Sequence, residues 1–237
     1  MQEEPKDHED LVRQLNDPLL RAEYARPYDH YHVGLTARVL GKLFIHSGNL
    51  LYGRTPSYAK FKAIEVIARI PYQSWESASY TLLSAFYWDE ARAMRLTRTG
   101  AFSRMAQDNE TMHVVVVAGI VRRLRAGGVI RHTIVPLMFS FLYFWIIYLL
   151  YMLRPKAALE LNFMFECHAH EQYQEFLDRE SERLKSTPVI SEFLAFYGRE
   201  ARSEYELFES IRNDELIHRN RTIRELEAMQ GFKAERK

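Results

Sequence analysis

The sequence predicts an all-α fold in a single large domain. Long stretches of the 237 residues carry apolar side chains three and four positions apart, the spacing that places them on one face of a helix. The breaks between these stretches are short, and no convincing run alternates between apolar and polar residues as a strand does. No linker rich in Gly, Ser or Pro divides the chain. We therefore expect one helical bundle preceded by a polar segment.

Charge balance and cysteine count argue against several classes of protein. The formal net charge is +1, whereas a nucleic-acid-binding protein draws its affinity from a basic surface, so we expect no nucleic-acid partner. Cys167 is the only cysteine, which rules out an intrachain disulfide and a cysteine-based zinc site. We expect no targeting signal, because the first residues lack an apolar core behind a basic start.

Three segments are expected along the chain. Residues 1–32 would form a polar N-terminal arm, mobile or clasping a partner, residues 33–230 the bundle domain, and residues 231–237 a C-terminal tail. The bundle domain opens with a stretch, 33–51, that has an apolar side and a basic side, made by Leu35, Val39 and Leu43 and by Arg38 and Lys42. Such a helix either lies at a membrane interface or packs on the bundle surface.

Four glutamates lie on otherwise apolar helical faces. Each face combines one glutamate with neighbours three, four and seven positions away: Phe61, Ile64, Glu65 and Ala68; Ala106, Glu110, His113, Val114 and Val117; Phe163, Glu166, His170, Tyr173 and Leu177; Phe208, Ile211, Glu215 and His218. A buried carboxylate is costly unless it is paired or bound to a metal. A single one of them could be salt-bridged or half-exposed, but their recurrence indicates a shared cation or cation pair.

Two of these glutamates begin a Glu-x-x-His unit, Glu110 with His113 and Glu215 with His218. Side chains three apart share a helix face, so the carboxylate and the imidazole can bind the same ion. Chance alone would place about one such unit in a chain of this composition. The order is the stronger signal: Glu65 and Glu166 alternate with the two units, at spacings that allow one helix out and one back. This pattern predicts a ferritin-like four-helix bundle around a metal pair.

A charge-free run, residues 133–153, has the length and composition of a membrane span and is flanked by basic residues, which are Arg122, Arg123, Arg125, Arg131, Arg154 and Lys156. Glu110 precedes this run and Glu166 follows it, with no second span between them. If the run crossed a bilayer, the two glutamates would lie on opposite sides. A shared metal site therefore requires the run to lie against the bundle, with its exposed side in one leaflet.

Four segments resemble the alternative oxidase family, most closely its plastid terminal oxidase branch, over about residues 58–224. The segments are KFKAIEVIARIPY at 60–72, NETMH at 109–113, FECHAHEQYQEFL at 165–177 and RNDELIHRN at 212–220. The resemblance implies a di-iron centre with six ligands, which are Glu65, Glu110, His113, Glu166, Glu215 and His218. It also implies that the run 133–153 is a helix on a monotopic membrane face.

The resemblance further implies a quinol:oxygen oxidoreductase that oxidises two quinols and reduces one O2 to two waters without pumping protons. Its partners would be plastoquinol or ubiquinol, O2 and a lipid surface in a bacterial inner, thylakoid or other organelle membrane, and a homodimer is possible. Tyr173 matches the family's essential tyrosine, which would supply an electron and a proton. Asp214 matches an aspartate that we expect to orient a ligand histidine through its second ring nitrogen.

The quinone pocket is expected at Lys60, Ile64, Ala169 and Gln172. Lys60 stands where the family usually has Arg, Val66 replaces a Thr, and Gln172 replaces a Ser or Thr. Lys keeps the charge of Arg but not its planar fork, so affinity for the quinone headgroup can differ.

Two alternatives remain at this point. One is a membrane-bound di-iron hydroxylase of a quinone precursor, which has the same ligand types but consumes O2 without quinol turnover. The other is a metal-free helical protein in which residues 133–153 span the membrane and the glutamates pair with arginines. Iron analysis separates the second from the rest, since a metal centre requires about two irons per chain.

Overall fold

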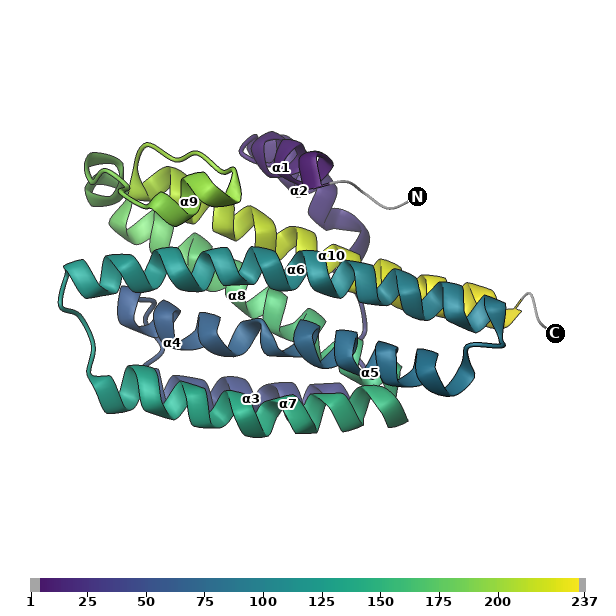
Figure 1. The fold of residues 1–237 in the computed structure, drawn as a ribbon. Helices are drawn as coiled ribbons and strands as arrows, with labels where there is room; N and C mark the ends of the chain where they lie inside the picture. Colours follow the sequence, from purple (N-terminus) through teal and green to yellow (C-terminus); the bar gives the residue numbers. More distant parts are fainter. Residues whose placement is uncertain (1–4, 235–237) are drawn as a thin grey trace.

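The structure, a computed structural model, describes residues 5–234, and it is helical along nearly all of them (Figure 1). The longer helices are α3 (Leu35–Tyr52), α4 (Tyr58–Ala68), α5 (Ile70–Phe86), α6 (Glu90–Arg123), α7 (Val135–Leu153), α8 (Pro155–Ser186) and α10 (Glu204–Ala234). The shorter ones are α1 (Pro5–Gln14), α2 (Pro18–Ala25), η1 (Arg26–Tyr28), η2 (Ile130–Ile134) and α9 (Glu192–Tyr197). The described residues form no strand, and the all-α prediction is confirmed.

Four lines of helix make the bundle. The pair α8 and α10 pack together along their length, and α6 packs on α5 and α4. Figure 1 shows α4 and α5 following one another along a single line. The break between them lies at Arg69, and Pro71 stands in the first turn of α5, where its missing N–H needs no partner within the helix. The predicted four-helix bundle is thereby confirmed.

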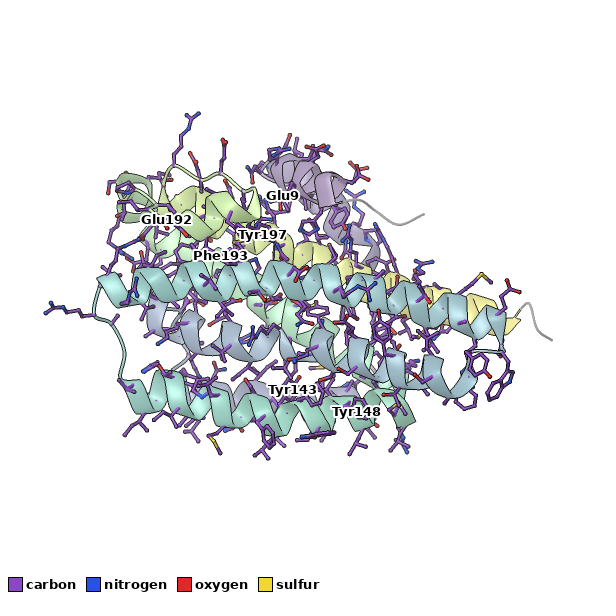
Figure 2. The ribbon with its side chains drawn as sticks, in the orientation of Figure 1. Glu9, Tyr143, Tyr148, Glu192, Phe193 and Tyr197 are labelled. Carbon is purple, nitrogen blue, oxygen red and sulfur yellow. The ribbon has the colours of Figure 1, made fainter. Side chains whose placement is uncertain are left out.

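Helices α3 and α7 lie along one side of this bundle (Figure 1). Helix α7 packs on α4, α5 and α8, and α3 packs on α8. Both expose apolar side chains, which Figure 2 shows projecting outward from α7. We call this surface the apolar face. It consists of Leu35, Val39, Leu43, Leu50, Leu51, Val129, Ile130, Ile134, Leu137, Met138, Phe141, Leu142, Trp145, Ile146, Leu149 and Leu153. Among the described helices, only the continuous stretch Ile130–Leu153 is long and apolar enough to cross a bilayer, and its most apolar window is 22% buried.

The N-terminal residues differ from the mobile arm that their polar composition suggested. Helices α1 and α2 pack on α10, and the side chains of His8, Val12 and Leu15 are buried against Leu216 and Ile217. A few well-placed apolar residues therefore dock a segment whose average composition is polar. The side chains of the expected C-terminal tail, 231–237, lie outside the described residues.

Two apolar clusters fill the bundle on either side of a polar centre. One contains Tyr72 and Trp75 with residues of α6, α7 and α8. The other contains Phe61, Tyr173 and Phe208, whose rings stack, with 4.2 Å between the ring centroids of Phe61 and Tyr173. One tyrosine from each cluster turns its hydroxyl to a glutamate of the polar centre.

Candidate metal centre

The structure brings the six predicted ligands together inside the bundle. They form two overlapping groups, one of Glu65, Glu110, His113 and Glu215 and the other of Glu110, Glu166, Glu215 and His218. Within each group the ligand atoms lie within 4.8 Å of one another. None of the six side chains is more than 4% exposed. We call the groups the His113 position and the His218 position.

Hydrogen bonds distinguish the shared glutamates from the terminal ones. Among the described residues, neither carboxylate oxygen of Glu110 or Glu215 has a hydrogen-bond partner. Glu65 accepts a hydrogen bond at Oε1 from the Tyr173 hydroxyl, while its Oε2 has no partner. Glu166 accepts at Oε1 from the Tyr72 hydroxyl at 2.6 Å. Two free oxygens suit a carboxylate that bridges two ions, and one free oxygen suits a carboxylate that binds a single ion.

The charges in this cluster call for cations. Burial raises the pKa of Glu65 and Glu166, and burial with repulsion from Glu110 and Glu166 raises the pKa of Glu215 well above its usual value. Within the described chain, no Lys or Arg lies within ion-pair distance of these carboxylates. The carboxylate oxygens and imidazole nitrogens that have no hydrogen-bond partner fit a pair of metal ions such as iron. Carboxylates and imidazoles are donors that iron accepts, and the cluster contains no thiolate of the kind that zinc sites and iron–sulfur clusters use.

The first histidine is oriented by an aspartate. His113 directs Nδ1 toward Glu65, Glu110 and Glu215, at 3.4, 3.5 and 3.5 Å from their nearest oxygens. Its Nε2 lies 2.9 Å from Oδ2 of Asp214. This geometry is the one expected of an aspartate that fixes the tautomer of a metal-binding histidine.

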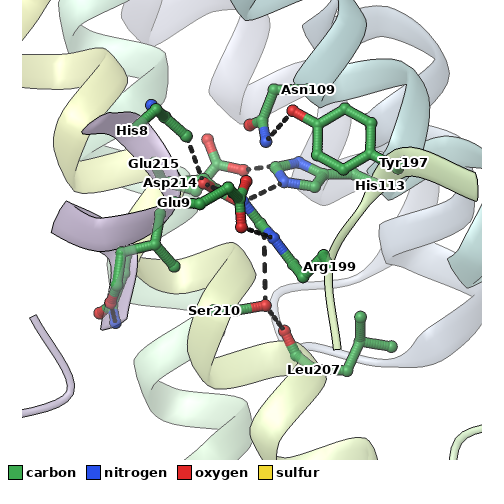
Figure 3. A network of polar contacts seen from close by, with 12 residues as sticks. His8, Glu9, Asn109, His113, Tyr197, Arg199, Leu207, Ser210, Asp214 and Glu215 are labelled. Carbon is green, nitrogen blue, oxygen red and sulfur yellow. Dashed lines mark hydrogen bonds and ion pairs between the residues drawn. The ribbon is translucent and has the colours of Figure 1, made fainter. Parts of the chain in front are cut away.

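Asp214 is itself held by charged and polar groups (Figure 3). Arg199 donates to both of its oxygens, and His8 Nε2 lies 2.8 Å from Oδ1. Burial alone would raise the pKa of Asp214, but the charge of Arg199 and the hydrogen bonds from His113 and His8 hold it well below its usual value. Glu9 completes the network through a 2.6 Å contact with Arg199.

Sequence reasoning missed His8, Glu9 and Arg199. Arg212 and Arg219 flank the last Glu-x-x-His unit in the sequence, but neither forms an ion pair with the buried candidate ligands. Instead, Arg212 donates to Gln174, Glu209 and Asn213, and Arg219 donates to Asp29, Asn220 and the Ala25 carbonyl. His8 and Arg199 lie far from Asp214 along the chain, so no local spacing marks them.

Two further residues support the His218 position, and one of them left a signal in the sequence. Asn162 donates to Oε1 of Glu166 at 2.8 Å and to the Tyr72 hydroxyl at 3.0 Å. Asn162 stands four residues before Glu166, a spacing that places both on one helix face. Tyr72 comes from another helix and shows no such pattern.

A cavity of about 170 Å³ reaches the centre from the side of α3 and α7. The four predicted pocket residues, Lys60, Ile64, Ala169 and Gln172, all line it. Its inner end is formed by the ligands Glu65, Glu166 and Glu215 together with Tyr173, and most of its wall is apolar.

Lys60 does not point a free donor into this cavity. Its ammonium donates to Asn49 Oδ1 at 3.2 Å, to the Arg54 carbonyl at 2.9 Å and to Gln172 Oε1 at 2.6 Å. An ammonium has three donors. Lys60 therefore ties α3, α4 and α8 together at the wall of the cavity, rather than offering itself to a ligand as Arg could.

The sequence belongs to a known family over most of its length. The family model described as alternative oxidase matches residues 58–225. This chain belongs to the alternative oxidase family. It is also 26% identical over 147 residues to ubiquinol oxidase 4, chloroplastic/chromoplastic, from Arabidopsis thaliana. That match covers 61% of this chain and 38% of the relative, so the chain spans well under two thirds of the relative's length. No solved structure matches.

The part of this chain that matches the family contains the six clustered candidate ligands, Tyr173, Asp214 and the four predicted pocket residues. The part outside the match contributes to the same centre. His8 and Glu9 of α1 reach Asp214 and Arg199, and Asn49 of α3 accepts a hydrogen bond from Lys60. Residues outside the matched segment thus contribute to the hydrogen-bond network around Asp214 and to the wall of the cavity at Lys60.

Proposed function

We propose that this protein is a membrane-associated quinol:oxygen oxidoreductase that oxidises two quinols and reduces one O2 to two waters without pumping protons. One observation carries the proposal: a buried cluster of orphaned carboxylate and imidazole groups lies at the inner end of an apolar cavity. An apolar pocket with a few polar groups at its end suits a quinol, which has a hydrophobic ring and tail and two hydroxyl groups.

In this proposal Glu65, Glu110, His113, Glu166, Glu215 and His218 hold two iron ions. When bound, the iron pair would supply electrons to O2 and offer it open coordination positions. The protein would orient these ligands with Tyr173, Tyr72, Asn162 and Asp214, whose hydrogen bonds to the ligands are in place.

Tyr173 would carry protons and an electron between quinol and centre. Burial, with the charges of Glu65 and Glu215, raises the pKa of Tyr173 well above its usual value, so its hydroxyl stays protonated. That hydroxyl donates to Glu65 and lies at the inner end of the cavity. A quinol hydroxyl at this end could pass its proton to Glu65 along the Tyr173 hydroxyl, which is within hydrogen-bond reach of the carboxylate.

Quinol would enter from a lipid surface at the apolar face. A helix that displays large apolar side chains outward, with basic residues at its ends, suits a protein lying in one leaflet. Arg131 precedes α7, and Arg154 and Lys156 follow it. Helices α3 and α7 both line the cavity, so the same elements would bind lipid and admit quinol. The segment boundaries at residues 32 and 230, and a homodimer, stay predictions.

Iron analysis and oxygen uptake test the proposal. Purified protein should contain about two irons per chain and consume O2 with a quinol analogue in the presence of cyanide, and Glu215→Ala should abolish the uptake. Normal uptake by Glu215→Ala would refute the site. O2 consumption without quinol turnover would favour the hydroxylase, and no iron after careful reconstitution would favour a metal-free protein.

A further inference from the structure

The two metal positions are built alike in their carboxylates. They share Glu110 and Glu215, and each adds one terminal glutamate. A tyrosine hydroxyl donates to Oε1 of each terminal glutamate, from Tyr173 to Glu65 and from Tyr72 to Glu166. Glu166 accepts a second hydrogen bond at the same oxygen, from Asn162 at 2.8 Å, so the carboxylates give the His113 position no advantage over the His218 position in binding a cation.

The two histidines are supported differently. His113 Nε2 lies 2.9 Å from Asp214, and Asp214 is held in turn by Arg199 and His8. His218 directs Nδ1 to within 3.0 Å of Glu110 Oε1. Neither of its ring nitrogens forms a hydrogen bond with any residue that the structure describes. Its ring also packs near other rings, with 6.2 Å between the centroids of His218 and His8, 5.5 Å between those of His218 and Tyr72 and 6.5 Å between those of His218 and His113.

This difference bears directly on metal affinity. A carboxylate that accepts the distal N–H of a ligand histidine selects the tautomer with a lone pair facing the metal, fixes the ring and makes the nitrogen more basic. Losing such a partner typically weakens metal binding by about 10–100-fold. His113 has this support from Asp214, whereas His218 must be oriented by packing alone.

We propose that the two metal positions of this protein are unequal: the His113 position binds a divalent ion first and most tightly, and the His218 position is the weaker, more readily exchanged one. The inference rests on the proposed metal pair. It also makes α1 part of the metal centre, because His8 and Glu9 hold the Asp214–Arg199 pair that supports His113.

Two variants isolate the two positions. His218→Ala leaves the His113 position complete, and His113→Ala leaves the His218 position complete. Metal-free full-length protein would be titrated with Co²⁺ under visible absorption, which reports the coordination of the ion. We expect one Co²⁺ to bind to His218→Ala about 10–100-fold more tightly than to His113→Ala. Equal or reversed affinities would overturn the inference, whereas a wild-type protein that binds no Co²⁺ and no Fe²⁺ would refute the metal pair itself.

Asp214 provides the second comparison. Asp214→Asn combined with His218→Ala should lower Co²⁺ affinity toward that of His113→Ala, since the amide cannot polarise His113 as the carboxylate does. Asp178→Asn, also combined with His218→Ala, changes an exposed carboxylate on α8; it is the matched control and should leave the affinity of His218→Ala unchanged. If Asp214→Asn binds Co²⁺ as tightly as the control, Asp214 does not set the difference.

The wild-type protein offers a readout that needs no stable variant. With histidine labelled by ¹⁵N, one equivalent of a diamagnetic divalent ion, Zn²⁺, should shift chiefly the signals of the histidine that it binds, and the N–H of that histidine should exchange slowly because Asp214 accepts it. We expect this first histidine to be His113, with His218 shifting only as the second equivalent is added. Shifts of both histidines in equal proportion from the start, or of His218 first, would contradict the inference.

Discussion

The interior centre and the apolar face of this protein invert the usual distribution of side chains. The centre buries four carboxylates that have no Lys or Arg partner among the described residues, although an unpaired buried charge is strongly unfavourable. The apolar face exposes large side chains such as Phe141, Leu142 and Trp145 to more than half of their area, although soluble proteins rarely display so large a patch. Both regions suit a binding partner: the buried carboxylates fit the cations proposed above, and the exposed apolar side chains fit the proposed lipid surface.

Tyr173→Phe should have the largest effect, because this residue stands where the centre meets the cavity that leads from the apolar face. The ring stacking on Phe61 is retained while the hydroxyl that faces Glu65 is lost. We expect quinol oxidation to fall by about 10²–10⁴-fold with iron content unchanged. Tyr151→Phe, a buried tyrosine of α7 packed on Trp75, is the control, and equal activity of the two variants would remove Tyr173 from the mechanism.

Glu215→Gln tests whether the centre is short of cations. In metal-free protein the substitution removes one of several repelling carboxylates and should raise Tm by a few degrees, since 1 kcal/mol shifts the Tm of a domain of this size by about 2–4 °C. In iron-loaded protein it replaces one of the carboxylates that would hold the iron and should lower Tm. Glu171→Gln, on the exposed side of α8, should change neither. A Glu215→Gln protein less stable than wild type in both states would show that the carboxylates do not need a cation.

The double substitution Leu142→Asp and Trp145→Asp tests the apolar face. Both side chains are exposed, at 58% and 51%, so folding should be little affected. Because burying one such side chain contributes about 1.5–3 kcal/mol, affinity for lipid vesicles should fall by at least about tenfold for each residue that inserts. Phe196→Asp replaces an 84% exposed aromatic on α9, away from this face, and should bind vesicles as wild type does. Equal losses in the two proteins would mean that binding is not specific to the face.

Lys60→Met should have the smallest effect, and it tests the wall of the cavity that connects the centre with the apolar face. The substitution removes three hydrogen bonds that tie α3, α4 and α8 at the cavity wall, each of which contributes about 1 kcal/mol. We expect KM for quinol to rise by about tenfold while iron content and kcat stay close to wild type. A fall in kcat with KM unchanged would mean that Lys60 acts on the chemistry instead.

Spacing along the chain was sufficient to find much of this site. The sequence reveals Glu110 with His113, and Glu215 with His218, because residues three or four positions apart lie on the same face of a helix. The pocket residues Lys60 and Gln172 came from family resemblance, and the structure lines the cavity with them. In contrast, the polar composition of residues 1–32 misled, because average polarity does not reveal that His8, Val12 and Leu15 dock on α10.

The amino-acid sequence by itself determined the helical fold, the six candidate ligands and the family. Only the tertiary structure decided which glutamates belong to both metal positions and which histidine is hydrogen-bonded to an aspartate. It also showed that the N-terminal helix α1 contributes His8 and Glu9 to the network around that aspartate. The physical reason is the range of the contacts. Helical periodicity is local, whereas His8 meets Asp214 across 206 positions of the chain, and such a contact leaves no periodic pattern in the sequence.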